Sequence, residues 1–304
     1  MAKQELDVME KHHIRVCGIE DSNYPRLLKH CADAPLVLFY KGILDDSDSK
    51  NIAIVGTRKA TEMGKKRVDT LLHELAETGY HPNIISGLAY GIDITAHTAC
   101  MHYGLKAQAV LGHGLHMVYP ASHKNMAEKI LEQGGALISE FPTCAQILPT
   151  NFLQRNRIVA GMSEAILVAE SPIKGGAMAT ARQALSYNRD VMAIPGRPED
   201  PTFAGCNLLI KQNIAALVEN IKDLLRILNW PPLPTGPYQM SLDLFPITNN
   251  EVLLLEILLK RGEQNIDQLH QLTRIPVHDL SVLLLKLELE GHVMQLPGNC
   301  YTLI

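Results

Sequence analysis

The chain has 304 residues, a length that suits one large domain and a smaller one. Apolar residues make up 46% and charged residues 20%, as in folded globular proteins, so a mostly disordered chain is excluded. The formal net charge is −4, so no overall positive charge attracts nucleic acid or a membrane. Any bound anion must be held by a local cluster of cations or by backbone dipoles.

Targeting and cysteine signals favour a protein of the reducing cytoplasm with no membrane partner. The opening MAKQELDVMEKHH lacks the apolar core of a signal peptide, and the apolar stretch at 252–259 is too short to span a bilayer. The six cysteines are scattered without a CxxC pair, which argues against a zinc ribbon and a secreted disulfide framework.

Residues 1–50 are expected to form a leader that packs on the core. The prolines in Tyr24-Pro25 and Asp33-Ala34-Pro35 predict turns and a short helix. The apolar run at 36–40 predicts one strand.

From residue 51 to 222, short apolar runs alternate with helical stretches. The runs lie at 52–55, 84–85, 107–111, 136–138, 165–169 and 191–194. Between the first two runs, apolar residues recur with the spacing of one helix face, at Val68, Leu71, Leu72 and Leu75. Strands that are apolar on both faces, with helices between them, predict a doubly wound α/β domain around a parallel sheet.

The last part of the chain predicts a linker and a small second domain. Residues 223–250 are rich in proline, which is incompatible with a continuous helix or a central strand. Residues 251–304 show three helical segments and then a β-hairpin, the layout of a winged helix. This domain has four basic and seven acidic residues, less positive charge than a helix that enters a DNA groove normally carries.

Glycine-rich turns follow several of the predicted strands, where open parallel sheets bind their ligands. The informative ones are Gly56-Thr57-Arg58, Ser86-Gly87 and Lys174-Gly175-Gly176. Glycine lets the backbone approach a ligand closely, and amides at a helix start attract anions. Because Arg58 and Lys174 add cationic donors, these turns predict a phosphate-binding edge. The GxGxxG and GxxxxGK[ST] patterns are absent, which disfavours NAD and ATP, and no cofactor is expected.

The densest polar motif is Asn151-Phe152-Leu153-Gln154-Arg155-Asn156-Arg157 in a predicted helix. Two arginines two positions apart do not share one helix face. One arginine can reach the ligand while the other ties the helix to its neighbours, and purely structural ion pairing of both stays open.

Three further residues admit a chemical role. Asp93 and His97 lie four apart on a predicted helix, but without a third ligand a capping aspartate and a hydrogen-bonded histidine are favoured over a metal site. Glu140 follows a strand as a general base would, yet nothing pairs with it. It supports the alternative function, a Rossmann-like nucleotide-binding or phosphoribohydrolase-type enzyme. A pure interaction adaptor is the other alternative.

The ordered motifs resemble the DNA-processing protein DprA (Smf) family, from Tyr24 to Lys222, and the C-terminal domain resembles the winged helix of many members. The resemblance is carried by Ile54-Val55-Gly56-Thr57-Arg58, Ser86-Gly87-Leu88-Ala89-Tyr90-Gly91-Ile92-Asp93, Tyr119-Pro120, Ser139-Glu140, Arg155-Asn156-Arg157-Ile158-Val159-Ala160-Gly161 and Pro195-Gly196.

The resemblance implies an extended Rossmann fold and a homodimer that is not an enzyme. It implies that the protein binds and protects single-stranded DNA during natural transformation and helps to load the RecA recombinase. Arg58 matches the family's phosphate-contacting arginine. The loop at Lys174-Gly175-Gly176 departs from the family's Ser-Gly-Ser-Leu by losing both hydroxyls, and residues 143–150 lack the basic residue that some members carry. The expected DNA-binding residues are Gly56, Thr57, Arg58, Ser86, Gly87, Arg155, Asn156, Arg157, Lys174, Gly175 and Gly176.

Overall fold

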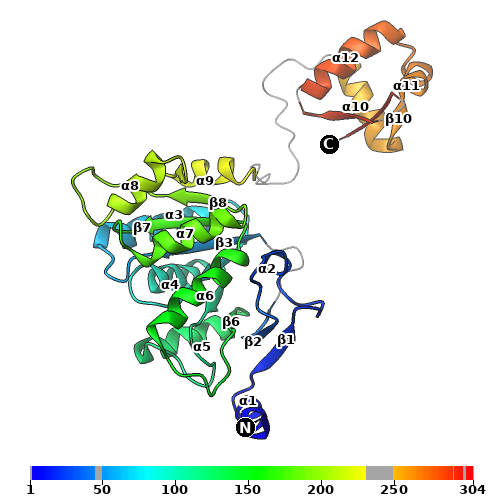
Figure 1. Cartoon of the computed structure of the whole chain (residues 1–304). Helices are drawn as coiled ribbons and strands as arrows, with labels where there is room; N and C mark the ends of the chain where they lie inside the picture. Colours follow the sequence, from blue (N-terminus) through cyan, green and yellow to red (C-terminus); the bar gives the residue numbers. More distant parts are fainter. Residues whose placement is uncertain (1, 45–49, 231–248, 290, 297–298, 304) are drawn as a thin grey trace. The chain divides into compact units, whose positions relative to one another are not determined.

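A computed structural model describes residues 2–44, 50–230, 249–289, 291–296 and 299–303 (Figure 1). The chain divides into two compact units, Met1–Thr235 and Gly236–Ile304, and each is described by itself. The predicted linker residues 231–248 lie outside the described residues.

The first unit is built on a sheet with strand order β1-β2-β6-β5-β4-β3-β7-β8-β9. Each of the six predicted apolar runs forms one parallel strand of this sheet, which confirms the predicted fold class. These strands are β3 (Asn51–Gly56), β4 (Asn83–Ser86), β5 (Lys106–Val110), β6 (Ala136–Ser139), β7 (Ala165–Glu170) and β8 (Asp190–Ala193), followed by the short β9 (Ala216–Leu217). All six residues of β7 are buried, as expected for a strand covered on both faces.

The leader extends this sheet with two strands where the sequence predicts one. After helix α1 (Ala2–Lys11), β1 (Arg15–Gly18) pairs antiparallel with β2 (Val37–Gly42), and β2 pairs antiparallel with β6. The helix α2 (Arg26–Lys29) lies between them in the chain. Because β1 has only four residues and two of them are exposed, it lacks the apolar run by which the other strands are found.

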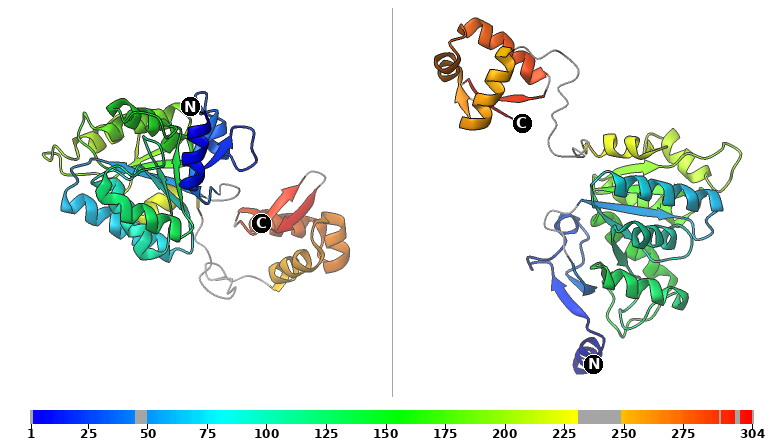
Figure 2. Two further views of the ribbon diagram at one scale, coloured as in Figure 1. Left: turned by 90° about the horizontal axis from the view of Figure 1, so that it is seen from below. Right: turned by 180° about the vertical axis from the view of Figure 1, so that it is seen from behind.

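Helices cover both faces of the sheet (Figures 1 and 2). Right-handed crossovers place α3 (Glu62–Glu77), α4 (Ile92–Tyr103) and α5 (Lys124–Glu132), which follows the 3₁₀ turn η1 (Ala121–His123), on one face. The chain then reverses direction, so α6 (Pro149–Gly161) and α7 (Gly176–Ser186) cover the other face. The reversal makes the junction of β3 and β7 the topological switch point, where open α/β sheets bind ligands.

The second unit confirms the predicted winged helix. Its three helices are α10 (Asn249–Arg261), α11 (Ile266–Thr273) and α12 (Val277–Leu289), and its small sheet comprises β10 (Gln264–Asn265), β11 (Val293–Leu296) and β12 (Cys300–Leu303). Leu254, Leu269 and Leu284 are fully buried in a core of its own. Residues 297–298 of the predicted hairpin lie outside the described residues.

The end of the first unit differs from the sequence expectation. The predicted linker starts at residue 223, inside α9 (Ile221–Ile227), which comes after α8 (Ala204–Lys211). The Asn220 side chain accepts hydrogen bonds from the first amides of α9. Trp230 is 3% exposed, its ring centre lies 5.1 Å from that of Tyr80, and the ammonium of Lys50 lies 4.5 Å from its ring centre. The packed chain therefore continues to Trp230, up to the first proline of the cluster.

We expect the substitution Trp230→Ala to lower the unfolding free energy of the first unit by about 3–5 kcal/mol, because it empties a packed aromatic site. Chemical denaturation followed by circular dichroism measures the loss, and Trp230→Phe, which keeps a ring, is the control that should lose less. A loss below about 1 kcal/mol in the alanine variant would place Trp230 outside the folded unit.

Candidate nucleic-acid interface

A cavity of about 420 Å³ opens at the carboxyl ends of β3, β4 and β7, next to the switch point. Its walls come from the turns after β3 and β4, from α6 and from the start of α7. Eight of the eleven predicted site residues line it, namely Gly56, Thr57, Arg58, Gly87, Arg155, Asn156, Gly175 and Gly176. The structure thus brings together turns that are far apart in the sequence.

Arg58 stands on a turn that is pinned from both sides. The amide of Thr57 donates to the Glu170 carbonyl (2.7 Å) at the end of β7, and the Thr57 carbonyl accepts from the Ile92 amide (3.2 Å) at the start of α4. A side chain at Gly56 would lie 2.4 Å from Ile92, so only glycine allows this packing. The exposed guanidinium of Arg58 lies 5.4 Å from the ring centre of Phe152 and has no carboxylate partner within the described ranges.

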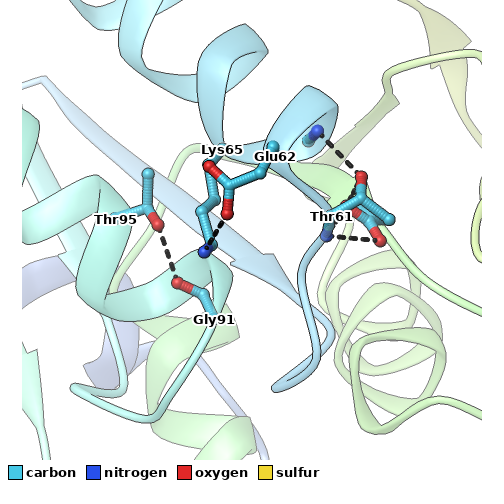
Figure 3. Close-up of polar contacts among 7 residues, drawn as sticks. Thr61, Glu62, Lys65, Gly91 and Thr95 are labelled. Atoms are coloured by element: carbon cyan, nitrogen blue, oxygen red, sulfur yellow. Dashed lines mark hydrogen bonds and ion pairs between the residues drawn. The ribbon is translucent and has the colours of Figure 1, made fainter.

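Two helix starts flank this turn (Figure 3). Thr61 caps α3 by accepting from the Gly64 amide (3.1 Å), while its own amide and hydroxyl donate to the buried carboxylate of Glu170 (3.0 Å each). At the start of α4, which has no side-chain cap, the Thr95 hydroxyl donates to the Gly91 carbonyl (2.9 Å). Lys65 is paired with Glu62 at 2.7 Å. The bonds of Thr61 fix the backbone that leads from Arg58 into α3.

The floor of the cavity is a buried arginine. Arg155 is 4% exposed and donates to the Val110 carbonyl (2.8 Å), and a side chain at Gly87 would lie 1.6 Å from its Nη1. The carboxylate of Asp93 accepts from the amides of Gly87 (3.2 Å) and Ala89 (3.4 Å). Burial raises the pKa of Asp93 and the nearby Arg155 charge opposes that rise. The Gly87 amide is therefore used within the protein, and this glycine supplies space for Arg155.

Arg157 ties α6 to its neighbours, which is the structural role predicted for one arginine of the pair. Its guanidinium donates to the Glu140 carboxylate and to the Asp33 carbonyl, and Gln154 also donates to Glu140 (3.2 Å). Neither Arg157 nor Glu140 lines the cavity. Because the Glu140 carboxylate is committed to this ion pair, it gives no support to the enzymatic alternative.

The remaining predicted residues lie beside the cavity. Ser86 is fully buried and donates to the Ile54 carbonyl (2.7 Å), so its hydroxyl does not face the cavity. Lys174 is exposed, and it immediately precedes Gly175 in the wall. The first amides of α7, which begins at Gly176, have no acceptor within the helix, and they supply the positive end of its dipole.

Phe152 lines the cavity, although the sequence analysis did not include it among the DNA-binding residues. It lies three and four positions before Arg155 and Asn156, so one face of α6 presents all three to the cavity. That spacing is visible in the sequence, and it is the signal that would have added Phe152 to the predicted site.

The fold and the cavity define a doubly wound α/β protein with a crevice at its switch point, lined by Arg58 and Arg155, and a separate winged helix. The family model for DNA recombination-mediator protein A matches residues 15–229, and the DprA winged helix domain matches residues 254–299. The chain therefore belongs to the DprA (Smf) family.

Named relatives extend over most of the chain. The Smf proteins of Synechocystis and Escherichia coli are 35% and 36% identical to it, over 93% and 95% of this chain and 78% and 76% of theirs. The X-ray structure of DprA from Streptococcus pneumoniae matches with a TM-score of 0.65 and 36% identity, covering 70% of this chain and 74% of that one. DprA from Helicobacter pylori, whose structure is described for its single-stranded DNA binding mode, matches with a TM-score of 0.61 and 27% identity over 72% and 97% of the chains.

Two features are absent from the described residues. These residues contain no helix that is long and apolar enough to cross a membrane. They also contain no group of three or more histidine, cysteine, aspartate or glutamate side chains placed to hold a metal ion.

The interpretation of His97 as a hydrogen-bonded histidine is wrong. His97 is fully buried on α4, and neither ring nitrogen has a hydrogen-bond partner in the part of the chain that the structure describes. Burial, with the positive charges of Arg155 and His123, lowers its pKa from 6.5 to about 3. His97 therefore stays neutral in the folded protein under conditions that protonate it in the unfolded chain.

We expect His97 to weaken the fold in mild acid. Between pH 6.5 and about 3 the unfolded state binds a proton that the folded state does not, so stability falls as the pH is lowered. The loss from this residue approaches about 1.4 kcal/mol per pH unit. Thermal unfolding of His97→Leu and the unmodified protein, compared at about pH 7.5 and about pH 5, should show the variant gaining relative stability in acid. A difference that does not change with pH would contradict this assignment.

Proposed function

We propose that this protein binds single-stranded DNA by holding its sugar-phosphate chain in the cavity at the switch point. The observation that carries the proposal is the exposed Arg58 guanidinium, which has no carboxylate partner within the described ranges and shares a cavity of about 420 Å³ with the start of α7. A guanidinium and free helix amides are the donors that phosphate oxygens accept from. Such contacts recognise no base, so binding is independent of sequence.

Phe152 supports the preference for a single strand. Its ring faces the same cavity as Arg58, so a phosphate and a neighbouring base are bound side by side. Bases that are free of a duplex stack on aromatic rings, whereas paired bases are already stacked on each other. Lys174 and Asn156 extend the phosphate contacts on either side.

The biological role follows the family. We propose that the protein protects DNA taken up in natural transformation, helps to load RecA on it, and carries out no chemical step on it. It acts in the cytoplasm as a homodimer. A dimer joins two sites that each carry few cations, and linking two sites raises avidity by about 10²-fold or more. The name of the matching family, a recombination mediator, supports this role.

The substitution Arg58→Gln should weaken binding of a labelled thymine oligomer by about 10- to 100-fold, because it removes charge-assisted hydrogen bonds to phosphate. Fluorescence anisotropy measures the dissociation constant. The matched control is Lys106→Gln, which removes one exposed positive charge at the amino end of β5, the sheet edge opposite the cavity. Equal losses in the two variants would reject the cavity as the site.

The affinity should also fall steeply with salt, since phosphate contacts release counterions. For single strands the slope of log K against log salt is about −0.7 per phosphate contacted. A salt titration of the unmodified protein should give a clearly negative slope, and Arg58→Gln should make it shallower by roughly one contact. A flat dependence would exclude binding led by phosphates.

A further inference from the structure

The mouth of the cavity carries the exposed aromatic side chains of the described residues. Tyr90 is 51% exposed and Tyr119 is 50% exposed, and no other tyrosine, phenylalanine or tryptophan in the described ranges is exposed to that degree. Exposed apolar side chains that gather in one place, rather than lie singly, mark binding surfaces. Their concentration beside a phosphate-binding cavity points to a ligand with flat apolar faces.

The rings continue from the cavity wall. The ring centre of Tyr119 lies 5.7 Å from that of Phe152, at an angle of 44°, and the Arg58 guanidinium lies 5.4 Å from the Phe152 ring centre. The Tyr90 hydroxyl lies 3.1 Å from the Ser122 hydroxyl in η1, directly after Tyr119-Pro120. The rings of Phe152, Tyr119 and Tyr90 therefore form a series that starts beside Arg58 and continues along η1.

Buried histidines hold both tyrosines in place. The amide of Tyr119 donates to Nε2 of His113 (3.1 Å), whose Nδ1 lies 3.1 Å from the Gly114 carbonyl. The Tyr90 ring packs edge-on against His123 at 4.8 Å, and Nδ1 of His123 lies 2.8 Å from the Leu88 carbonyl. Burial lowers the pKa of His113, which keeps Nε2 free to accept the Tyr119 amide. Rings that are held before binding lose little conformational entropy when a ligand stacks on them.

We propose that Tyr119 and Tyr90 form a stacking path on which the bases of the DNA strand lie as it leaves the cavity. The path rests on the proposed function, since it needs a strand whose phosphates are held at Arg58. Aromatic platforms of this kind accept any base, because every base has a π-face. The path gives the protein a second, non-ionic source of affinity and sets the direction in which the strand leaves.

The test separates the bases from the phosphates. Binding of the full-length protein is measured with a thymine oligomer and with two matched oligomers in which either the 5′ half or the 3′ half is abasic. All three carry the same phosphates. We expect the unmodified protein to lose about 10-fold or more in affinity for one of the two half-abasic oligomers, and little for the other.

The tyrosine variants identify the protein side of that loss. Tyr119→Leu and Tyr90→Leu should each bind the thymine oligomer about 10-fold more weakly, and they should show no further loss on the abasic oligomer that the unmodified protein binds poorly. Tyr119→Phe and Tyr90→Phe keep the ring and should lose less affinity than the leucine variants. Thermal unfolding checks that the leucine variants are folded.

Each contrary outcome has a distinct meaning. If the unmodified protein binds both half-abasic oligomers as well as the thymine oligomer, the path is overturned without need of any variant. If the leucine variants keep full affinity for the thymine oligomer, or lose equally on all three oligomers, the tyrosines do not stack on bases. If the unmodified protein fails to bind the thymine oligomer, the proposed function fails and the path fails with it.

Discussion

The buried guanidinium of Arg155 is the interaction on which the cavity depends. It joins α6 to the ends of β4 and β5 through the space at Gly87, the Val110 carbonyl and the nearby charge of Asp93. Burying a charge is costly unless hydrogen bonds and an opposite charge compensate it, and here one hydrogen bond and the charge of Asp93 offset part of that cost. Because Phe152 and Asn156 lie on the same face of α6, the position of Arg155 also sets theirs.

The charges around the cavity are arranged so that the Arg58 guanidinium stays available to a ligand. Arg157 is paired with Glu140 and Lys65 with Glu62, while Asp93, which also lines the cavity, partly offsets the charge of Arg155. Arg58 differs from these in having no carboxylate partner among the described residues. The cavity therefore presents an exposed guanidinium next to the start of α7, in a protein whose net charge is −4.

The sequence predicted what depends on local pattern. The six central strands, the helix face at Val68 and Leu72 and the winged helix follow from apolar periodicity, and the place of Arg58 follows from its position after a buried strand. What escaped prediction depends on contacts between distant residues. Trp230 is buried because Tyr80 lies beside it, and the Ser86 hydroxyl turns inward because the Ile54 carbonyl accepts from it. No local pattern contains these partners.

The leader supports one wall of the cavity although it does not line it. The Glu5 carboxylate of α1 accepts from the amide and hydroxyl of Thr143 (2.6 and 2.7 Å), in the segment that leads into α6. Asp33 accepts from Arg157 on α6 itself, while Arg189 donates to the Leu27 carbonyl (2.8 Å). The turn after β3 is fixed by the sheet, but α6 is held from outside by these contacts. The two walls that carry Arg58 and Phe152 are thus positioned by different parts of the chain: the sheet holds the first, and Arg155 together with the leader holds the second.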